Sequence, residues 1–222
     1  KCEGKNIGRA NETSPEQQAV LEMEALIAKK IKSGYSYNKE APITVQLAMK
    51  VKSYQDQINN IKFPCFSTPK LNGVNAIYRR VDGQLTIYSR GGEIYPAIPH
   101  LEPFIHEIME LSEFTELNGE LYIHGEHLQD IQSTVKKPNE LSPKLTFAIF
   151  DICDSKDIYL IRNKLIHNAF LAFYKTQREK LETIAFLTGV VCDSHADIEN
   201  HYLACVRSGF EGTVIKNYDA LY

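Results

Sequence analysis

Residues 74–90 carry the pattern that most restricts how this chain can fold. Two runs containing β-branched and aromatic residues, 74–80 and 84–90, are separated by Asp82-Gly83. Asp-Gly is a strong two-residue turn signal, because both positions accept the positive φ angles of a tight hairpin. The sequence therefore predicts an antiparallel strand pair at this point.

Helical patterns lie on both sides of this hairpin. Near the start, Ser14 is an N-cap, Pro15 takes the first helical position and Gln17 completes a capping box. Gly34 is a stop signal for that helix. Further helices are predicted over 46–52, 99–111 and 160–181 and after Ser194, and further strands over 117–123, 144–152, 183–192 and 213–217. Strands mixed with long helices predict an α+β fold, with antiparallel sheets flanked by helices.

Composition narrows the class of protein. The chain has no long apolar run and a polar start, so neither a membrane span nor a signal peptide is expected. Its five cysteines are scattered without a Cys-x-x-Cys pair, which argues against a zinc site and fits a reducing cytoplasm. A net charge of −3 argues against a globally basic surface for nucleic acid but allows a local basic groove. We expect a cytoplasmic monomer that belongs to a longer protein.

Five segments place charged side chains beside glycines or inside strands. They are residues 68–75, 88–93, 118–122, 147–152 and 211–216. In the first, Lys70 lies between a proline and Gly73, and glycine lets a backbone turn sharply or approach a ligand closely. Each segment alone fits a strand edge or a salt bridge, but their order and spacing together are hard to explain by chance.

In this order the segments resemble the motifs of covalent nucleotidyltransferases, and most closely those of phage-type ATP-dependent DNA ligases. The family motifs are Lys-x-Asp-Gly-x-Arg, Ser-Arg-x-Gly, Asp-Gly-Glu, an aromatic-Asp strand and Glu-Gly-x-x-x-Lys. They match residues 70–75, 89–92, 118–120, 150–151 and 211–216. Residues 120–125 and 128–133 also resemble phage ligases, and residues 4–9 do so more loosely. The resemblance implies an ATP-grasp-like nucleotidyltransferase domain over 61–222, after an N-terminal helical segment and connector over 1–60.

The resemblance implies roles for the matching side chains. Lys70 would attack the α-phosphate of ATP and carry AMP as a phosphoramidate. Arg90 would hold the sugar or the substrate 5′-phosphate, and Glu120 would bind the ribose hydroxyls. The other implied nucleotide contacts are Thr68, Pro69, Phe150, which would stack on adenine, and Lys216, which would reach the α-phosphate.

The resemblance also implies a metal and a nucleic acid. Glu211, with Glu120, would help to hold Mg²⁺, which suits a reaction that spreads charge over phosphate oxygens. Nicked duplex DNA would contact Arg90, Asn72 and Asn75, with RNA as the other candidate. The seven histidines indicate no metal cluster.

Three positions depart from the family motifs. The expected acids are Asn72 and Asn118, and the expected arginine is Asn75. A free lysine has a pKa of about 10.4 and is almost entirely protonated at neutral pH. A carboxylate at position 72 would hold Lys70 protonated and Asn72 would not, so we hypothesise that adenylylation persists while strand sealing is weakened.

Several alternatives stay open. Some RNA ligases have Lys-x-x-Gly-x-Asn in the first motif, which this sequence matches. A capping-type guanylyltransferase and an NAD-dependent ligase fit the extended motifs less well. A degenerate, non-catalytic nucleic-acid-binding module is favoured by the three asparagines. The family's last motif, a lysine pair, and its usual OB-type barrel are not found before Tyr222.

Overall fold

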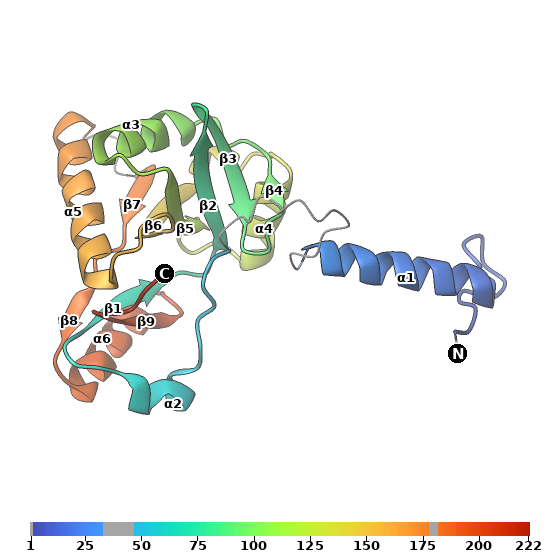
Figure 1. Cartoon of the computed structure of the whole chain (residues 1–222), viewed down its shortest axis with the longest axis horizontal. Helices are drawn as coiled ribbons and strands as arrows, with labels where there is room; N and C mark the ends of the chain where they lie inside the picture. Colours follow the sequence, from blue (N-terminus) through green and yellow to red (C-terminus); the bar gives the residue numbers. More distant parts are fainter. Residues whose placement is uncertain (1, 33–46, 178–181) are drawn as a thin grey trace. The chain divides into compact units, whose positions relative to one another are not determined.

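The computed structural model describes residues 2–32, 47–177 and 182–222 (Figure 1). It consists of two compact units, Lys1–Val45 and Gln46–Tyr222. The first unit contains a turn and α1 (Pro15–Lys32). Its capping box is confirmed, because the Ser14 amide donates to Gln17 Oε1 at 2.9 Å and the Gln17 amide donates to Ser14 Oγ at 3.2 Å. The stop signal at Gly34 lies outside the described residues.

The second unit is built on a sheet with strand order β4-β3-β2-β5-β6-β7. The strands are β2 (Val74–Val81), β3 (Gln84–Ser89), β4 (Ile94–Tyr95), β5 (Glu116–Tyr122), β6 (Thr146–Ile152) and β7 (Ile184–Phe186). Neighbours are antiparallel, except that β6 and β7 are parallel. The predicted hairpin is confirmed, with φ angles of 50° at Asp82 and 77° at Gly83.

Three helices pack against this large sheet. They are α3 (Glu102–Ser112), α4 (Leu128–Lys136) and α5 (Tyr159–Thr176). Figure 1 shows α3 and α5 side by side, and α4 packs on β2 and β5. Fully buried side chains such as Tyr78 and Phe147, whose ring centroids are 4.8 Å apart, fill the space between helices and sheet. The helix α4 was not predicted from the sequence.

A second, smaller sheet has strand order β8-β1-β9 and is antiparallel throughout. Its strands are β8 (Val190–Cys192), β1 (Cys65–Lys70) and β9 (Gly212–Asn217), and α6 (His195–Arg207) packs against them. The helix predicted after Ser194 is confirmed, and Ser194 caps it, since Ser194 Oγ accepts a hydrogen bond from the Asp197 amide at 3.2 Å. The mixture of helices with mainly antiparallel sheets confirms the α+β prediction.

Two predictions about secondary structure are wrong. The single strand expected over 183–192 is two strands in different sheets, β7 and β8. Gly189 lies between them against Phe66, where an added Cβ would stand 2.9 Å from the Phe66 ring. The helix expected over 46–52 is absent from 47–52. Instead, α2 (Tyr54–Gln57) and a 3-10 turn (Ile58–Asn60) follow, and a second 3-10 turn spans Ser142–Lys144.

Among the described helices, none has the length and hydropathy needed to cross a bilayer.

Candidate active site

Lys70 stands at the end of β1, opposite the start of β9. The register pairs it with Gly212, and the Glu211 amide donates to the Lys70 carbonyl at 3.1 Å. The Lys70 ammonium forms an ion pair with the Glu211 carboxylate. Their side chains are 44% and 36% exposed, so both remain accessible to a ligand. The structure thus brings together the predicted nucleophile and the predicted metal ligand.

Lys216 extends from the same face of the small sheet as Lys70. Because Phe66 pairs with Lys216 and side chains alternate along a strand, Phe66, Thr68 and Lys70 share the face that carries Lys216. The two lysines are four register positions apart, which is about 13 Å along the strand direction. Thr68 is buried and its hydroxyl donates to the Val214 carbonyl at 3.3 Å.

The Lys216 ammonium is held over the end of β6. It lies 2.9 Å from Asp151 Oδ2 and donates to the Phe150 carbonyl at 3.3 Å. It also lies over two aromatic rings, 5.0 Å from the centroid of Phe150 and 4.2 Å from that of Tyr159. Two residues that the sequence analysis selected, Phe150 and Lys216, are therefore in direct contact.

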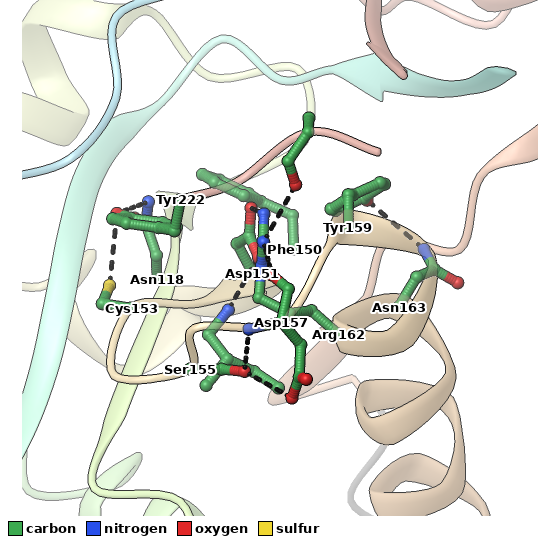
Figure 2. Close-up of polar contacts among 12 residues, drawn as sticks. Asn118, Phe150, Asp151, Cys153, Ser155, Asp157, Tyr159, Arg162, Asn163 and Tyr222 are labelled. Carbon is green, nitrogen blue, oxygen red and sulfur yellow. Dashed lines mark hydrogen bonds and ion pairs between the residues drawn. The ribbon is translucent and has the colours of Figure 1, made fainter. Parts of the chain in front are cut away.

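A buried arginine completes this group (Figure 2). Arg162 Nε and Nη2 donate to the two oxygens of Asp151 at 2.7 and 3.3 Å, and neither side chain is more than 1% exposed. Arg162 Nη1 also donates to the Ala220 carbonyl at 3.1 Å, which ties α5 to the segment after β9. Arg162 was not among the site residues predicted from the sequence. Its signal was a charge at a position spaced with the buried residues of α5, among them Tyr159 and Ile166.

The large sheet contributes a cleft of about 400 Å³. It is lined by residues of the β1–β2 loop, β2, the β3–β4 hairpin, β5 and α4: Gly73, Val74, Asn75, Ser89, Arg90, Gly91, Glu93, Tyr95, Glu120, Gln132 and Lys136. Burial raises the pKa of Glu120 to about 7, opposed by the charges of Arg90 and Lys70 and by a hydrogen bond from Asn75. Those opposing charges show that Glu120 lies within electrostatic reach of both cations.

Gly73 is needed for close packing beside Glu120. A Cβ at this position would stand 2.7 Å from Glu120 Cγ and 2.6 Å from the Leu121 carbonyl oxygen. The prediction that a glycine after Lys70 permits a close approach therefore holds, although the partner is β5 itself. Asn72 lies in the same β1–β2 loop and is half-buried, while Pro69 is paired with Thr213 in the small sheet.

Two of the three unexpected asparagines contact each other. Asn75 Nδ2 donates to Asn118 Oδ1 at 2.9 Å and to the Gly119 carbonyl at 3.2 Å. Asn118 Nδ2 donates to the Tyr222 hydroxyl at 2.8 Å, which also accepts from Cys153 Sγ at 3.2 Å (Figure 2). Asn75 and Asn118 are 7% and 3% exposed. A neutral, buried hydrogen-bond chain thus connects the positions where the family motifs have Arg and Asp.

The positions of the carboxylates show whether they could bind the expected Mg²⁺. Within 2–32, 47–177 and 182–222, no three His, Cys, Asp or Glu side chains are grouped so as to hold a metal. Mg²⁺ is usually bound by one or two carboxylates together with substrate phosphates. The exposed carboxylate of Glu211 fits that requirement, and it would be shared with the Lys70 ammonium.

The hypothesis about Asn72 meets one fact that the sequence did not predict. It assumed that Lys70 lacks a neighbouring carboxylate, but Glu211 contacts the Lys70 ammonium. The missing acid at position 72 therefore does not leave the lysine without a counter-ion.

Comparisons with known proteins agree with this geometry. The family model described as "ATP dependent DNA ligase domain" matches residues 45–222. None of the curated proteins compared with the chain matches it. The structure of the Chlorella virus DNA ligase–adenylate is similar, with 22% identity, a TM-score of 0.59, and coverage of 79% of this chain and 61% of that one.

Two further solved structures have the same fold. The ATP-dependent DNA ligase of bacteriophage T7, in complex with ATP, shows 15% identity and a TM-score of 0.56, with 79% of this chain and 63% of that chain covered. A putative ATP-dependent DNA ligase from Aquifex aeolicus shows 14% identity and a TM-score of 0.56, with 90% and 59% covered. This chain spans about three fifths of the length of these ligases. The predicted nucleotidyltransferase fold is confirmed, and the chain belongs to the ATP-dependent DNA ligase domain family.

Proposed function

We propose that this chain is the adenylation domain of an ATP-dependent DNA ligase that seals nicks in duplex DNA. The observation that carries the proposal is the contact between Lys70 and Glu211 at the paired ends of β1 and β9. Family membership supports the reaction class, and the electrostatic influence of Lys70 and Arg90 on Glu120 supports a site that extends into the cleft.

Lys70 is the nucleophile of the first transfer and the leaving group of the second. Its neutral amine attacks the α-phosphorus of ATP, the bond to the β-phosphate oxygen breaks, and pyrophosphate leaves. A phosphoramidate then joins AMP to Lys70 Nζ. In the second step an oxygen of the DNA 5′-phosphate attacks the same phosphorus, the P–N bond breaks, and the amine regains a proton. A strand 3′-hydroxyl finally displaces AMP and closes the nick.

Glu211 links nucleophile activation to the metal. In the structure its carboxylate pairs with the Lys70 ammonium. Glu211 would hold Mg²⁺ with the phosphates of ATP, and Mg²⁺ supplies charge neutralisation on those phosphates when bound. A carboxylate engaged in this way stabilises the Lys70 ammonium less, which favours loss of the proton from the amine.

The remaining residues position the nucleotide and the nucleic acid. Glu120 and Arg90 line one cleft and would hold the ribose and a phosphate. Phe150 would stack on adenine, and Lys216 would exchange part of its contact with Asp151 for the α-phosphate. Thr68, Pro69, Asn72 and Asn75 complete the proposed contacts. We place the protein as a cytoplasmic monomer acting in DNA replication, recombination or repair in a bacterium or phage-infected cell.

An RNA ligase is the second candidate function. It is favoured by Asn75, which completes the RNA-ligase form of the first motif and lines the cleft. Nicked duplexes with DNA or RNA on the 5′-phosphate side separate the two functions directly. Faster sealing of the RNA nick would replace the DNA assignment.

Labelled ATP tests the enzymatic proposal. With ATP labelled in the α-phosphate and Mg²⁺, the chain should gain one covalently bound AMP, detected by gel and by intact mass. Its P–N bond should be stable in alkali and cleaved by acid. Lys70→Arg keeps the charge but removes the nucleophilic amine, so the label should be lost entirely. Lys137→Arg, at an exposed lysine outside the cleft, is the matched control. If the wild-type chain takes no label, it is not this enzyme. The alternative of a non-catalytic nucleic-acid-binding module would then be favoured.

A further inference from the structure

One wall of the cleft has no part in the roles given above. That wall is α4, from which Gln132 and Lys136 line the cleft. The two residues are four positions apart, so they project from the same side of the helix. Ile131 and Val135 are buried in the main core, which fixes the rotation of α4 about its axis. Gln132 and Lys136 therefore face the cleft because the core packing requires it.

The opposite wall presents Arg90 on a well-held turn. The Ser89 amide donates to the Glu93 carbonyl at 2.7 Å, and the Gly92 amide donates to the Ser89 carbonyl at 2.9 Å. Ser89 Oγ accepts from the Glu93 amide at 2.9 Å. This turn lines the cleft together with Arg90, so the guanidinium is attached to a backbone that hydrogen bonds hold in place.

The chemistry of the two walls favours a phosphate. A guanidinium, an ammonium and a side-chain amide all offer N–H donors, and Arg in particular matches the oxygens of a phosphate. Two carboxylates, Glu93 and Glu120, also line the cleft. Their negative charge weakens the binding of anions that do not form specific hydrogen bonds with the cleft. The volume of about 400 Å³ falls in the range of about 300–1,000 Å³ typical of small-ligand sites.

The position of Lys70 separates this phosphate from the one it attacks. Among the described residues, Lys70 is not part of the cleft lining, whereas Arg90 and Lys136 are. The charges of both Lys70 and Arg90 lower the pKa of Glu120, so Glu120 lies near both cations. A nucleotide attached to Lys70 with its ribose at Glu120 would leave the α4 side of the cleft for a second phosphate.

We propose that Gln132 and Lys136 of α4 extend the phosphate site expected at Arg90, so that they help to recognise the terminal 5′-phosphate of the nucleic-acid strand that accepts AMP. Lys136 supplies charge and Gln132 supplies a hydrogen bond, and both add to the single contact expected from Arg90. The inference rests on the proposed ligase function. The triphosphate of ATP offers the same chemistry, so the two sources must be separated by experiment.

The test measures the two transfer steps separately for Lys136→Gln and Gln132→Ala. The first step is adenylylation of Lys70 by labelled ATP, and the second is AMP transfer from the pre-adenylylated chain to a nicked duplex with a 5′-phosphate. Loss of a hydrogen bond to a charged group should slow the second step about tenfold. Adenylylation should stay within about twofold. Lys136→Arg should restore transfer, and Lys137→Gln, which removes the neighbouring charge, is the matched control.

A binding assay gives a readout that does not depend on activity. The wild type should bind a 5′-phosphorylated nick more tightly than a 5′-hydroxyl nick, and Lys136→Gln should reduce that preference. The slope of log affinity against log salt should also fall by about one. Both variants change exposed residues, and thermal unfolding checks that they stay folded.

Two results would overturn the subsite. Unchanged transfer and an unchanged preference for the 5′-phosphate in both variants would remove it. Slower adenylylation with normal transfer would assign the same side chains to the triphosphate. If the wild type takes no AMP, the ligase proposal fails, but the binding assay still decides whether α4 recognises a 5′-phosphate.

Discussion

Two neighbouring regions of the candidate site bury polar groups in opposite ways. Around β6, α5 and β9, the buried groups are charged: Arg162 and Lys216 share the carboxylate of Asp151. Where Asn75 of β2 meets Asn118 of β5 they are neutral: the two amides bond to each other, and Asn118 bonds to Tyr222. The Arg79–Glu116 ion pair lies farther along the same two strands. The two networks are adjacent, because Asn118 and Asp151 are register partners on β5 and β6.

The difference shows what each region can tolerate. Charges removed from water must be paired, and loss of one partner leaves the other uncompensated. Amides need only hydrogen bonds, and their burial carries no charge penalty. The charged network is therefore expected to be the more fragile of the two. It also holds Lys216, whose position matters for the proposed chemistry.

The largest effect is expected from Arg162→Met. This change leaves Asp151, which is 1% exposed, with Lys216 as its remaining cation. Breaking a buried ion pair by removing one partner should lower the free energy of unfolding by about 4 kcal/mol. Urea unfolding measures it, with Arg90→Met as the control at an exposed arginine. Equal losses in the two variants would contradict the distinction between the regions.

A second prediction introduces charge into the neutral region. Asn75→Arg places a cation at a position that is 7% exposed and should cost about 3 kcal/mol of stability. Adding Asn118→Asp supplies the opposite charge at the position that now contacts Asn75, and should recover at least about 1 kcal/mol. A double-mutant cycle of unfolding free energies gives the coupling. Additive losses would show that the two asparagines are not a compensated pair.

This second test bears on the three departures from the family motifs. If Asn75 and Asn118 are exchangeable as a pair with Arg and Asp, the two changes are one coordinated change. The two asparagines would then not indicate that the chain has lost catalytic activity. Asn72 would be the only departure left that lacks a structural counterpart.

The smallest effect concerns the cleft and pH. Burial raises the pKa of Glu120 to about 7, so the folded chain holds that proton more tightly than the unfolded chain. The resulting stability is complete below a pH of about 4.5 and is lost as the pH rises through about 7. Glu120→Gln should remove this part of the pH dependence of urea unfolding. Glu110→Gln, at an exposed carboxylate, should not. A slope unchanged by Glu120→Gln would show that the carboxyl is not desolvated.

The sequence by itself determined the features that depend on near neighbours in the chain. The Asp82-Gly83 turn and the caps at Ser14 and Ser194 are set by residues within three or four positions, and the structure contains each of them. The order of short motifs was enough to indicate the family, because each motif is local. Lys70 and Glu211 were selected in this way, although nothing local shows that they touch.

Only the tertiary structure decided the features that depend on distant contacts. The run at 183–192 has continuous strand character, yet it divides at Gly189 because its two ends pair with different sheets. The helix α4 was missed although Ile131 and Val135 have helical spacing, since a short apolar pattern becomes decisive only when a sheet lies beneath it. The Asn75–Asn118 contact and the position of Arg162 likewise arise from strand register and packing. The strand pairing, packing and hydrogen bonds that stabilise these features join groups far apart in the chain, and only folding brings those groups together.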